Sequence, residues 1–237
     1  MAPASHLLVL PDRTEHPFRN MEEDLLLLYQ NPAPDAFLFR HYGWEFPCWT
    51  CGYSQKFSYV KDCTGGTQGT IFRRGTGGGI VPHKNDWTFS MVIGNGHSAW
   101  HRPPRDFYDV LHKQIAVILG KFHIPAQLHK CEGSLCNGAP PSECFRSPVL
   151  SDVLLAGTGE KVAGAAIKKT REGILLQGSI QKEHLPAVPW EAFKNSLVKA
   201  LAQDFGCSAS AHPWPFSAED KWPPYAGRIH CPAWLKK

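Results

Sequence analysis

Short apolar runs bounded by Gly, Pro, Asn and Asp recur along the N-terminal part of the chain, and this pattern is typical of β-strands. The segments that it predicts to be strands are residues 6–11, 35–42, 47–54, 69–74 and 86–94. Residues 18–31 differ, because their leucines recur on one face of a helix. We expect Asn20 to cap this helix and acidic residues to lie in its first turn. A shorter helix is expected near residues 60–63.

The second part of the chain combines two longer helical patterns with a further group of strands. Residues 107–124 place apolar side chains at helical spacing, at Val110, Leu111, Ile115, Ile118 and Leu119. Residues 153–180 predict three strands joined by two turns. A late helix is expected over residues 189–206, with Pro189 near its start and Gly206 just past its end. Together these elements predict an α+β fold, in which helices pack against a mostly antiparallel sheet.

Composition and charge are those of an ordinary globular protein. The 237 residues contain no internal repeat or linker, so we expect one domain over residues 1–237, with residues 206–237 as an extended Pro- and Trp-rich tail. No apolar run reaches the length of a membrane span, and no basic region precedes the short apolar run near the N-terminus. We therefore expect a soluble cytoplasmic protein. The net charge of +4 comes from scattered lysines and arginines, which argues against nucleic acid and suits an acidic protein partner.

The eight cysteines raise the question of a redox or zinc site. Cys48 and Cys51 form a Cys-Trp-Thr-Cys motif, but a four-cysteine zinc site would need a second pair at the same spacing. Cys131 and Cys136 are separated by four residues instead of two. Because the first pair lies in a strand-like segment, we favour buried cysteines over a metal or redox centre.

A glycine-rich stretch, FRRGTGGGIVPH over residues 72–83, is the strongest candidate for a binding loop. Glycine lets a ligand approach the main chain closely, and successive amide groups in such a turn can bind an anion. The stretch matches neither a P-loop nor a dinucleotide fingerprint. It could also be a tight connection between strands, but two adjacent arginines favour a ligand that carries an acyl chain, a phosphate or both. The candidate residues are Arg73, Arg74, Thr76, Gly77, Gly78, Gly79 and His83.

Two further segments carry candidate chemistry. Lys161 follows a Gly-Thr-Gly turn and precedes small residues, Gly164 and Ala165 among them, that leave room for a ligand beside the strand. A lone lysine of this kind is also common as a solvated side chain. Cys144 lies in the long irregular segment 129–152, where a nearby cation such as Lys161 or His83 could lower the pKa of its thiol.

Four of these segments, in order, resemble the lipoate–protein ligase and octanoyltransferase family, which shares its catalytic domain with biotin protein ligases. They are NMEEDLLLL, RHYGWEFPCWTCGYSQ, RRGTGGGIVPH and EKVAGAAIKKTREGILLQGSI, and they span most of residues 18–205. The resemblance implies the α+β fold of those catalytic domains. Within the family, HKNDWTFS is closer to the transferase pattern than to the ligase pattern. The segment ECFRSP resembles the motif that holds the nucleophilic cysteine of octanoyltransferases acting from acyl carrier protein.

Three residues depart from the transferase pattern. Gly79 stands where an arginine is usual, Ile167 where a glutamine is usual, and Gln177 where a histidine is usual. The first is a ligase-like feature, and the other two put polar contacts to the acyl carbonyl or to a partner in question.

The resemblance implies a two-step acyl transfer with Cys144 as nucleophile and Lys161 as the residue that holds the carbonyl oxygen and favours the thiolate. Acyl carrier protein would be the donor, and a lipoyl domain or a glycine-cleavage carrier protein the acceptor. No cofactor is expected for this reaction, and we expect a monomer without membrane or nucleic-acid partners. An ATP- and Mg²⁺-dependent lipoate ligase, with Arg73, the glycine loop and Lys161 on the phosphate, is the second possibility. A non-catalytic acyl-binding relative is the third, and a biotin ligase is the weakest because its glycine–arginine motif is missing from the sequence.

Overall fold

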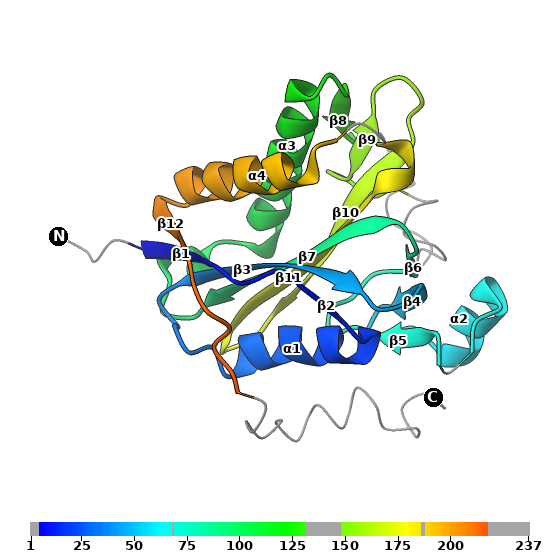
Figure 1. The fold of residues 1–237 in the computed structure, drawn as a ribbon, viewed down its shortest axis with the longest axis horizontal. Helices are drawn as coiled ribbons and strands as arrows, with labels where there is room; N and C mark the ends of the chain where they lie inside the picture. Colours follow the sequence, from blue (N-terminus) through cyan, green and yellow to red (C-terminus); the bar gives the residue numbers. More distant parts are fainter. Residues whose placement is uncertain (1–4, 68, 131–147, 186–187, 218–237) are drawn as a thin grey trace.

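The computed structural model describes residues 5–67, 69–130, 148–185 and 188–217, which are organised around a large mixed sheet (Figure 1). Within these ranges nine strands form the sheet, in the order β12-β1-β3-β7-β11-β10-β9-β8, and β2 pairs with β3 as well. Their bounds are Ser5–Val9 (β1), Arg13–Glu15 (β2), Phe37–Trp44 (β3), Asp86–Gly94 (β7), Ala126–Leu128 (β8), Val153–Leu155 (β9), Lys161–Lys169 (β10), Gly173–Gln181 (β11) and Cys207–Ala211 (β12). The pairs between β3 and β8 along this order are antiparallel, whereas the pairs of β1 with β12 and β3, and of β2 with β3, are parallel. The predicted α+β fold with a mostly antiparallel sheet is confirmed.

Helices cover both faces of this sheet. Helix α1 (Pro17–Tyr29) lies on one face, and α3 (Pro104–Lys121) and α4 (Trp190–Asp204) lie on the other (Figure 1). Short 3₁₀ turns, η1 (Ser98–His101) and η3 (Lys182–His184), extend two of the connections. The main core lies between the sheet and the pair α3 and α4, where four of the five apolar residues predicted for the long helix are fully buried and Val110 is half-buried. Both long helices are therefore where the apolar spacing predicts them.

A second, smaller sheet flanks one end of the large one. Its strands are β4 (Cys48–Cys51), β5 (Ile71–Arg73) and β6 (Val81–His83), in the order β5-β4-β6, and helix α2 (Phe57–Thr64) packs beside them. Cys48 and Cys51 are buried here, and burial raises the pKa of both thiols. Neither thiol is suited to redox or metal chemistry, and the described residues contain no group of three metal-binding side chains. Cys131 and Cys136 lie outside the described residues.

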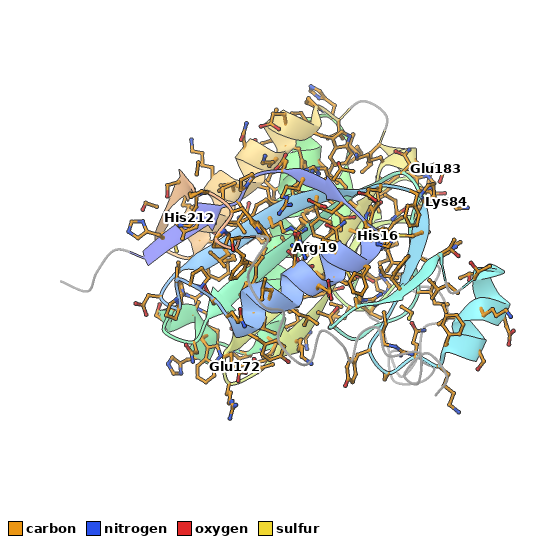
Figure 2. The ribbon with its side chains drawn as sticks, turned by 60° about the horizontal axis from the view of Figure 1, so that its bottom comes forward. His16, Arg19, Lys84, Glu172, Glu183 and His212 are labelled. Carbon is orange, nitrogen blue, oxygen red and sulfur yellow. The ribbon has the colours of Figure 1, made fainter. Side chains whose placement is uncertain are left out.

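The start of α1 differs from the prediction. His16 is the N-cap, because its Nδ1 atom accepts a hydrogen bond from the N–H of Phe18, and Pro17 occupies the first helical position. His16 and Arg19 are labelled along this helix in Figure 2, which also shows Lys84 and Glu183 together near η3. Asn20 lies inside the helix, buried, and donates to the carbonyl of Gly43 at 2.9 Å. The acidic residues consequently fall after the first turn, so both predictions about this end were wrong.

The described residues after α4 add a strand to the large sheet. Strand β12 pairs with β1 at its edge, and the part of the expected extended tail from residue 218 onward lies outside the described residues. Residues 212–217 then continue past α1 (Figure 1), where Trp214 and Phe216 pack on a second cluster of buried leucines. The Trp214 ring also lies under Arg13 and Arg40, with guanidinium-to-ring distances of 5.0 and 5.4 Å. Among the described helices, none is long and apolar enough to cross a bilayer.

Candidate active site

A cavity opens where the large and small sheets meet. Its volume is about 60 Å³, and its mouth is open to solvent. Its apolar lining consists of Met21, Tyr42, Trp44, Val81, Ala165 and Ala166. Its polar lining includes Thr50, Arg74, His83, Thr88, Lys161 and Gln177.

The glycine-rich loop forms one wall of the cavity, and Arg74 holds it in shape. The Arg74 guanidinium donates to the carbonyls of Gly77 (2.6 Å) and Gly79 (2.8 Å) and to the Thr50 hydroxyl (3.3 Å). Of the two adjacent arginines, Arg74 is therefore the one that contacts the glycine loop. Of the three consecutive glycines only Gly78 adopts a positive φ, 88°, and it lines the cavity. Among the described residues, the N–H groups of Gly77 and Gly78 have no hydrogen-bond acceptor.

Arg73 faces a different part of the structure. Its guanidinium donates to the carbonyls of Tyr53 (2.8 Å) and Gln55 and so holds the turn that follows β4. This turn lies directly against the glycine loop, because a side chain at Gly52 would overlap the carbonyl of Gly78. Arg73 is not among the side chains that line the described cavity. Its position therefore supports the loop from behind.

His83 lies on the cavity wall within a buried polar cluster. Its Nδ1 atom is 2.8 Å from a carboxylate oxygen of Asp86, and its Nε2 atom is 2.9 Å from the Thr50 hydroxyl. The Nδ1–H group donates to Asp86. Burial alone would raise the pKa of Asp86, but the charge of His83 and hydrogen bonds from His83, Thr88 and Ser179 outweigh burial and lower it. The carboxylate thus stays ionised and fixes the orientation of the imidazole.

Asp24 forms the centre of a charged network beneath the cavity. This fully buried carboxylate accepts hydrogen bonds from Arg40 (2.9 Å), Tyr42 (3.0 Å), Ser90 (2.6 Å) and Gln177 (2.7 Å). Burial, followed by the nearby carboxylate, raises the pKa of Tyr42 well above its usual value, so the phenol keeps its proton and donates it. The network joins α1 to three strands of the large sheet.

Gln177 connects this network to the glycine loop. Its carbonyl oxygen accepts from the Thr76 hydroxyl at 2.8 Å, while its amide nitrogen donates to Asp24. The glutamine that replaces the family's usual histidine is therefore fully bonded, and it lines the cavity. Ile167, the other departure on the sheet, packs against the main core and is absent from the described cavity lining.

Lys161 reaches the cavity as one half of a buried ion pair. Its Nζ atom is 2.7 Å from a carboxylate oxygen of Asp152, and both side chains are almost inaccessible to solvent. Asp152 also accepts from the Tyr108 hydroxyl and from the N–H of Val149 at 2.6 Å. Asp152 and Tyr108 were not expected from the sequence. The signal that could have revealed Asp152 is its place just before β9, since the β9–β10 hairpin brings it beside Lys161.

Gly164 has a different purpose from the one expected. A Cβ atom there would lie 2.7 Å from Cε and 2.9 Å from Nζ of Lys161, so the missing side chain makes room for the lysine. Ala165 and Ala166, further along β10, do line the cavity.

The structure thus brings together at one cavity most of the residues singled out by the sequence: Arg74, Gly78, His83, Lys161, Gly164 and Ala165. Thr76, Gly77 and Gly79 lie immediately behind this wall, and Arg73 lies further away. Cys144 falls outside the described residues, in the segment that ends shortly before Asp152.

The α+β domain thus holds a cavity with an apolar lining, and the wall of this cavity carries a buried lysine and the glycine loop. The chain belongs to the family described as the lipoyl protein ligase A/B catalytic domain, which matches residues 16–202.

Comparison with individual proteins agrees with this family. Octanoyltransferase LipM of Kyrpidia tusciae is 32% identical over 146 residues, which are 60% of this chain and 53% of that protein. The chain therefore spans about half the length of this relative. The fold of this chain is similar to that of lipoate-protein ligase A bound with ATP. The TM-score is 0.65 at 15% identity, over 99% of this chain and 95% of that one. A bi-partite lipoate protein ligase from Thermoplasma acidophilum, solved in a study with its E2 lipoyl domain, gives 0.62 at 16% identity over 99% and 93%.

Proposed function

We propose that this chain transfers an octanoyl group from acyl carrier protein, through a thioester on Cys144, to a lysine of a lipoyl-domain protein. The observation that carries the proposal is the apolar cavity with Lys161, a buried cation, on its wall beside the glycine loop. The relative named Octanoyltransferase LipM supports the acyl group and the type of reaction. The Thermoplasma ligase, which is described together with its E2 lipoyl domain, supports the class of acceptor.

The apolar lining suits the acyl chain. Burial of each methylene group contributes about 0.8 kcal/mol, so the roughly six methylene groups of an octanoyl chain would contribute about 5 kcal/mol. Met21, Tyr42 and Trp44 offer such a surface on the side of α1 and β3. With the acyl chain on this surface, its thioester group would lie near Gly78 and Lys161, where the lining becomes polar.

The reaction proceeds in two balanced displacements. First, the Cys144 sulfur attacks the thioester carbonyl, the new carbon–sulfur bond forms, and the bond to the carrier's sulfur breaks. The carrier thiol leaves with the proton that Cys144 gave up. Second, a lysine amine of the acceptor attacks the acyl-enzyme, a carbon–nitrogen bond forms, and the proton lost by the amine restores the Cys144 thiol. In both steps negative charge develops on the carbonyl oxygen, and Lys161 with the N–H of Gly78 would stabilise it.

An ATP-dependent lipoate ligase is the second candidate, favoured by Gly79 and by the fold shared with a ligase bound with ATP. A triphosphate needs cationic groups to hold it. Among the described residues that line the cavity, the cationic side chains are Arg74 and Lys161, and both already bind protein oxygens.

Intact-protein mass spectrometry after mixing with octanoyl–acyl carrier protein, without ATP, tests the proposal. We expect one octanoyl group on the wild type and none on Cys144→Ala. Cys63→Ala is the matched control, because Cys63 is an exposed free thiol on α2, and this variant should still acquire the adduct. Transfer to a lipoyl domain only when lipoate, ATP and Mg²⁺ are added would establish the ligase instead. No adduct under either condition would leave a non-catalytic acyl-binding protein.

A further inference from the structure

Asp152 makes more contacts than its ion pair with Lys161 alone. The carboxylate is fully buried, and it accepts from the Tyr108 hydroxyl, from the N–H of Val149 and from Lys161. Ser151, the residue before it, has a positive φ of 69°, a conformation that a non-glycine residue adopts only at a cost. A buried carboxylate that receives three donors remains ionised and needs a positive charge beside it. Lys161 is the group in the described structure that supplies this charge.

The lysine is directed toward Asp152 by its own strand. Pairing between β9 and β10 is irregular between Lys161 and Ala163, and the lysine side chain then lies across Gly164, within 2.9 Å of where a Cβ would be. The irregular pairing begins at Lys161 itself, and the glycine leaves space for the lysine side chain. Backbone geometry therefore places the ammonium group on Asp152, at the cavity wall.

Helix α3 packs against this pair. It presents Tyr108, Asp109 and His112 on this side, and His112 is fully buried with its Nδ1 atom 2.8 Å from the Ser151 carbonyl. Burial lowers the pKa of His112 to about 4, so this imidazole is neutral at physiological pH. Tyr108 contributes a hydroxyl, and Asp109 adds negative charge on the helix side.

We propose that Asp152 is a positioning residue that keeps Lys161 as an ammonium ion on the cavity wall, so that the lysine acts as a fixed positive charge and not as a base. The inference rests on the proposed acyl transfer for its catalytic meaning. A lysine that is already protonated cannot take the thiol proton of Cys144. The proton must therefore pass to the departing carrier thiol, which balances the first displacement without a separate base. The lysine contributes by stabilising the thiolate and the oxyanion.

The protonation state is tested without any turnover. In ¹⁵N-labelled protein at pH 8, the Nζ resonance of Lys161 distinguishes an ammonium group from an amine, and Lys161→Arg assigns it. We expect an ammonium signal in the wild type and an amine signal in Asp152→Asn, because a buried lysine without its counter-ion loses its proton. An amine signal in the wild type, or an ammonium signal in both proteins, would overturn the proposal. This result stands even if the wild type forms no acyl-enzyme, which would refute the proposed function alone.

Kinetics of acyl-enzyme formation test whether Asp152 acts through Lys161. We expect Lys161→Ala to lower the rate constant by about 100- to 1000-fold, as for loss of an oxyanion donor, and Asp152→Asn by about 10- to 100-fold. The donor concentration at half-maximal rate should change less than about twofold, since neither residue needs to bind the carrier. The double variant should be no slower than Lys161→Ala alone, whereas multiplied losses would show that Asp152 acts independently.

A milder variant covers the case in which Asp152→Asn does not fold. Tyr108→Phe removes one hydrogen bond from Asp152 and leaves the carboxylate and the ammonium in place. We expect it to retain the ammonium signal and to slow acylation by about threefold to tenfold, close to the loss of one hydrogen bond. An amine signal in this folded variant would contradict the role given to the carboxylate.

Discussion

Replacement of Asp24 by asparagine should destabilise the protein severely, although the two side chains have nearly the same shape. Asp24 is fully buried and accepts four hydrogen bonds, one of them from the charged Arg40. An asparagine keeps one oxygen and turns the other into an amide, whose protons would point at two of these donors. Arg40 would retain Glu23 as its remaining carboxylate partner among the described residues.

The expected magnitude follows from these contacts. Breaking a buried ion pair by neutralising one partner costs about 3–5 kcal/mol, and the donors left facing an amide add to that cost. We expect the free energy of unfolding to fall by about 4 kcal/mol, or the melting temperature by about 8–16 °C for a domain of this size. Urea unfolding followed by tryptophan fluorescence measures this change from the midpoint and slope.

The control is Asp62→Asn, which makes the same charge change at an exposed position on α2. Surface substitutions of this kind usually change stability by less than about 0.5 kcal/mol. If the two variants differ by less than about 1 kcal/mol at equal slope, the network does not hold α1 on the sheet in the way described.

Three further outcomes follow from buried groups. At pH 8 a thiol reagent should modify Cys63 rapidly and Cys48 only after unfolding, because burial raises the pKa of Cys48 and removes its thiolate. Peptide mapping of native and denatured protein measures both reactions, and equal reaction of the two thiols in the native protein would contradict the burial of Cys48. Gly178→Ala should lower stability by about 1–3 kcal/mol in urea, since its methyl group would overlap the ring of Phe89, and an unchanged midpoint would contradict this packing. The lowered pKa of Asp86 contributes stability that is present above about pH 4 and is lost as pH falls through its folded-state value. Asp86→Asn should therefore flatten the acid limb of stability measured from pH 5 to 2, and an equally steep limb would exclude that source.

How much of this structure the sequence predicts depends on the length of each element. The helix at 104–121 and the strand at 86–94 are long enough for their apolar spacing to be unambiguous, and both were predicted within a few residues. Strands β2, β6 and β8 have three residues each and show no usable period, so they were missed. Asn20 was taken as a cap because it precedes the apolar run, but Pro17 can occupy the first helical position and starts the helix earlier.

The candidate site was predicted in its parts but not in its connections. Glycines and cations are visible in the sequence, so the loop and Lys161 could be found. Their partners are set by tertiary contacts: Asp24 meets Gln177 across 153 positions, and Asp152 meets Lys161 through a hairpin register that strand patterns alone do not give. The family's usual residues did not reveal that Gln177 would bind Thr76 and Asp24 at once.

The pairing of β1 with β12 has a consequence for how the protein is made. Ser5 lies opposite Cys207, so β1 cannot pair with β12 until the ribosome has added about two hundred further residues. Until then β1 has β3 on one side and an open edge on the other, which is a template for pairing with another chain. Closing a loop of that length is slow compared with local helix formation. Nascent chains should therefore be most prone to misassembly before residues 207–211 have been synthesised, and a chaperone would help most at that stage.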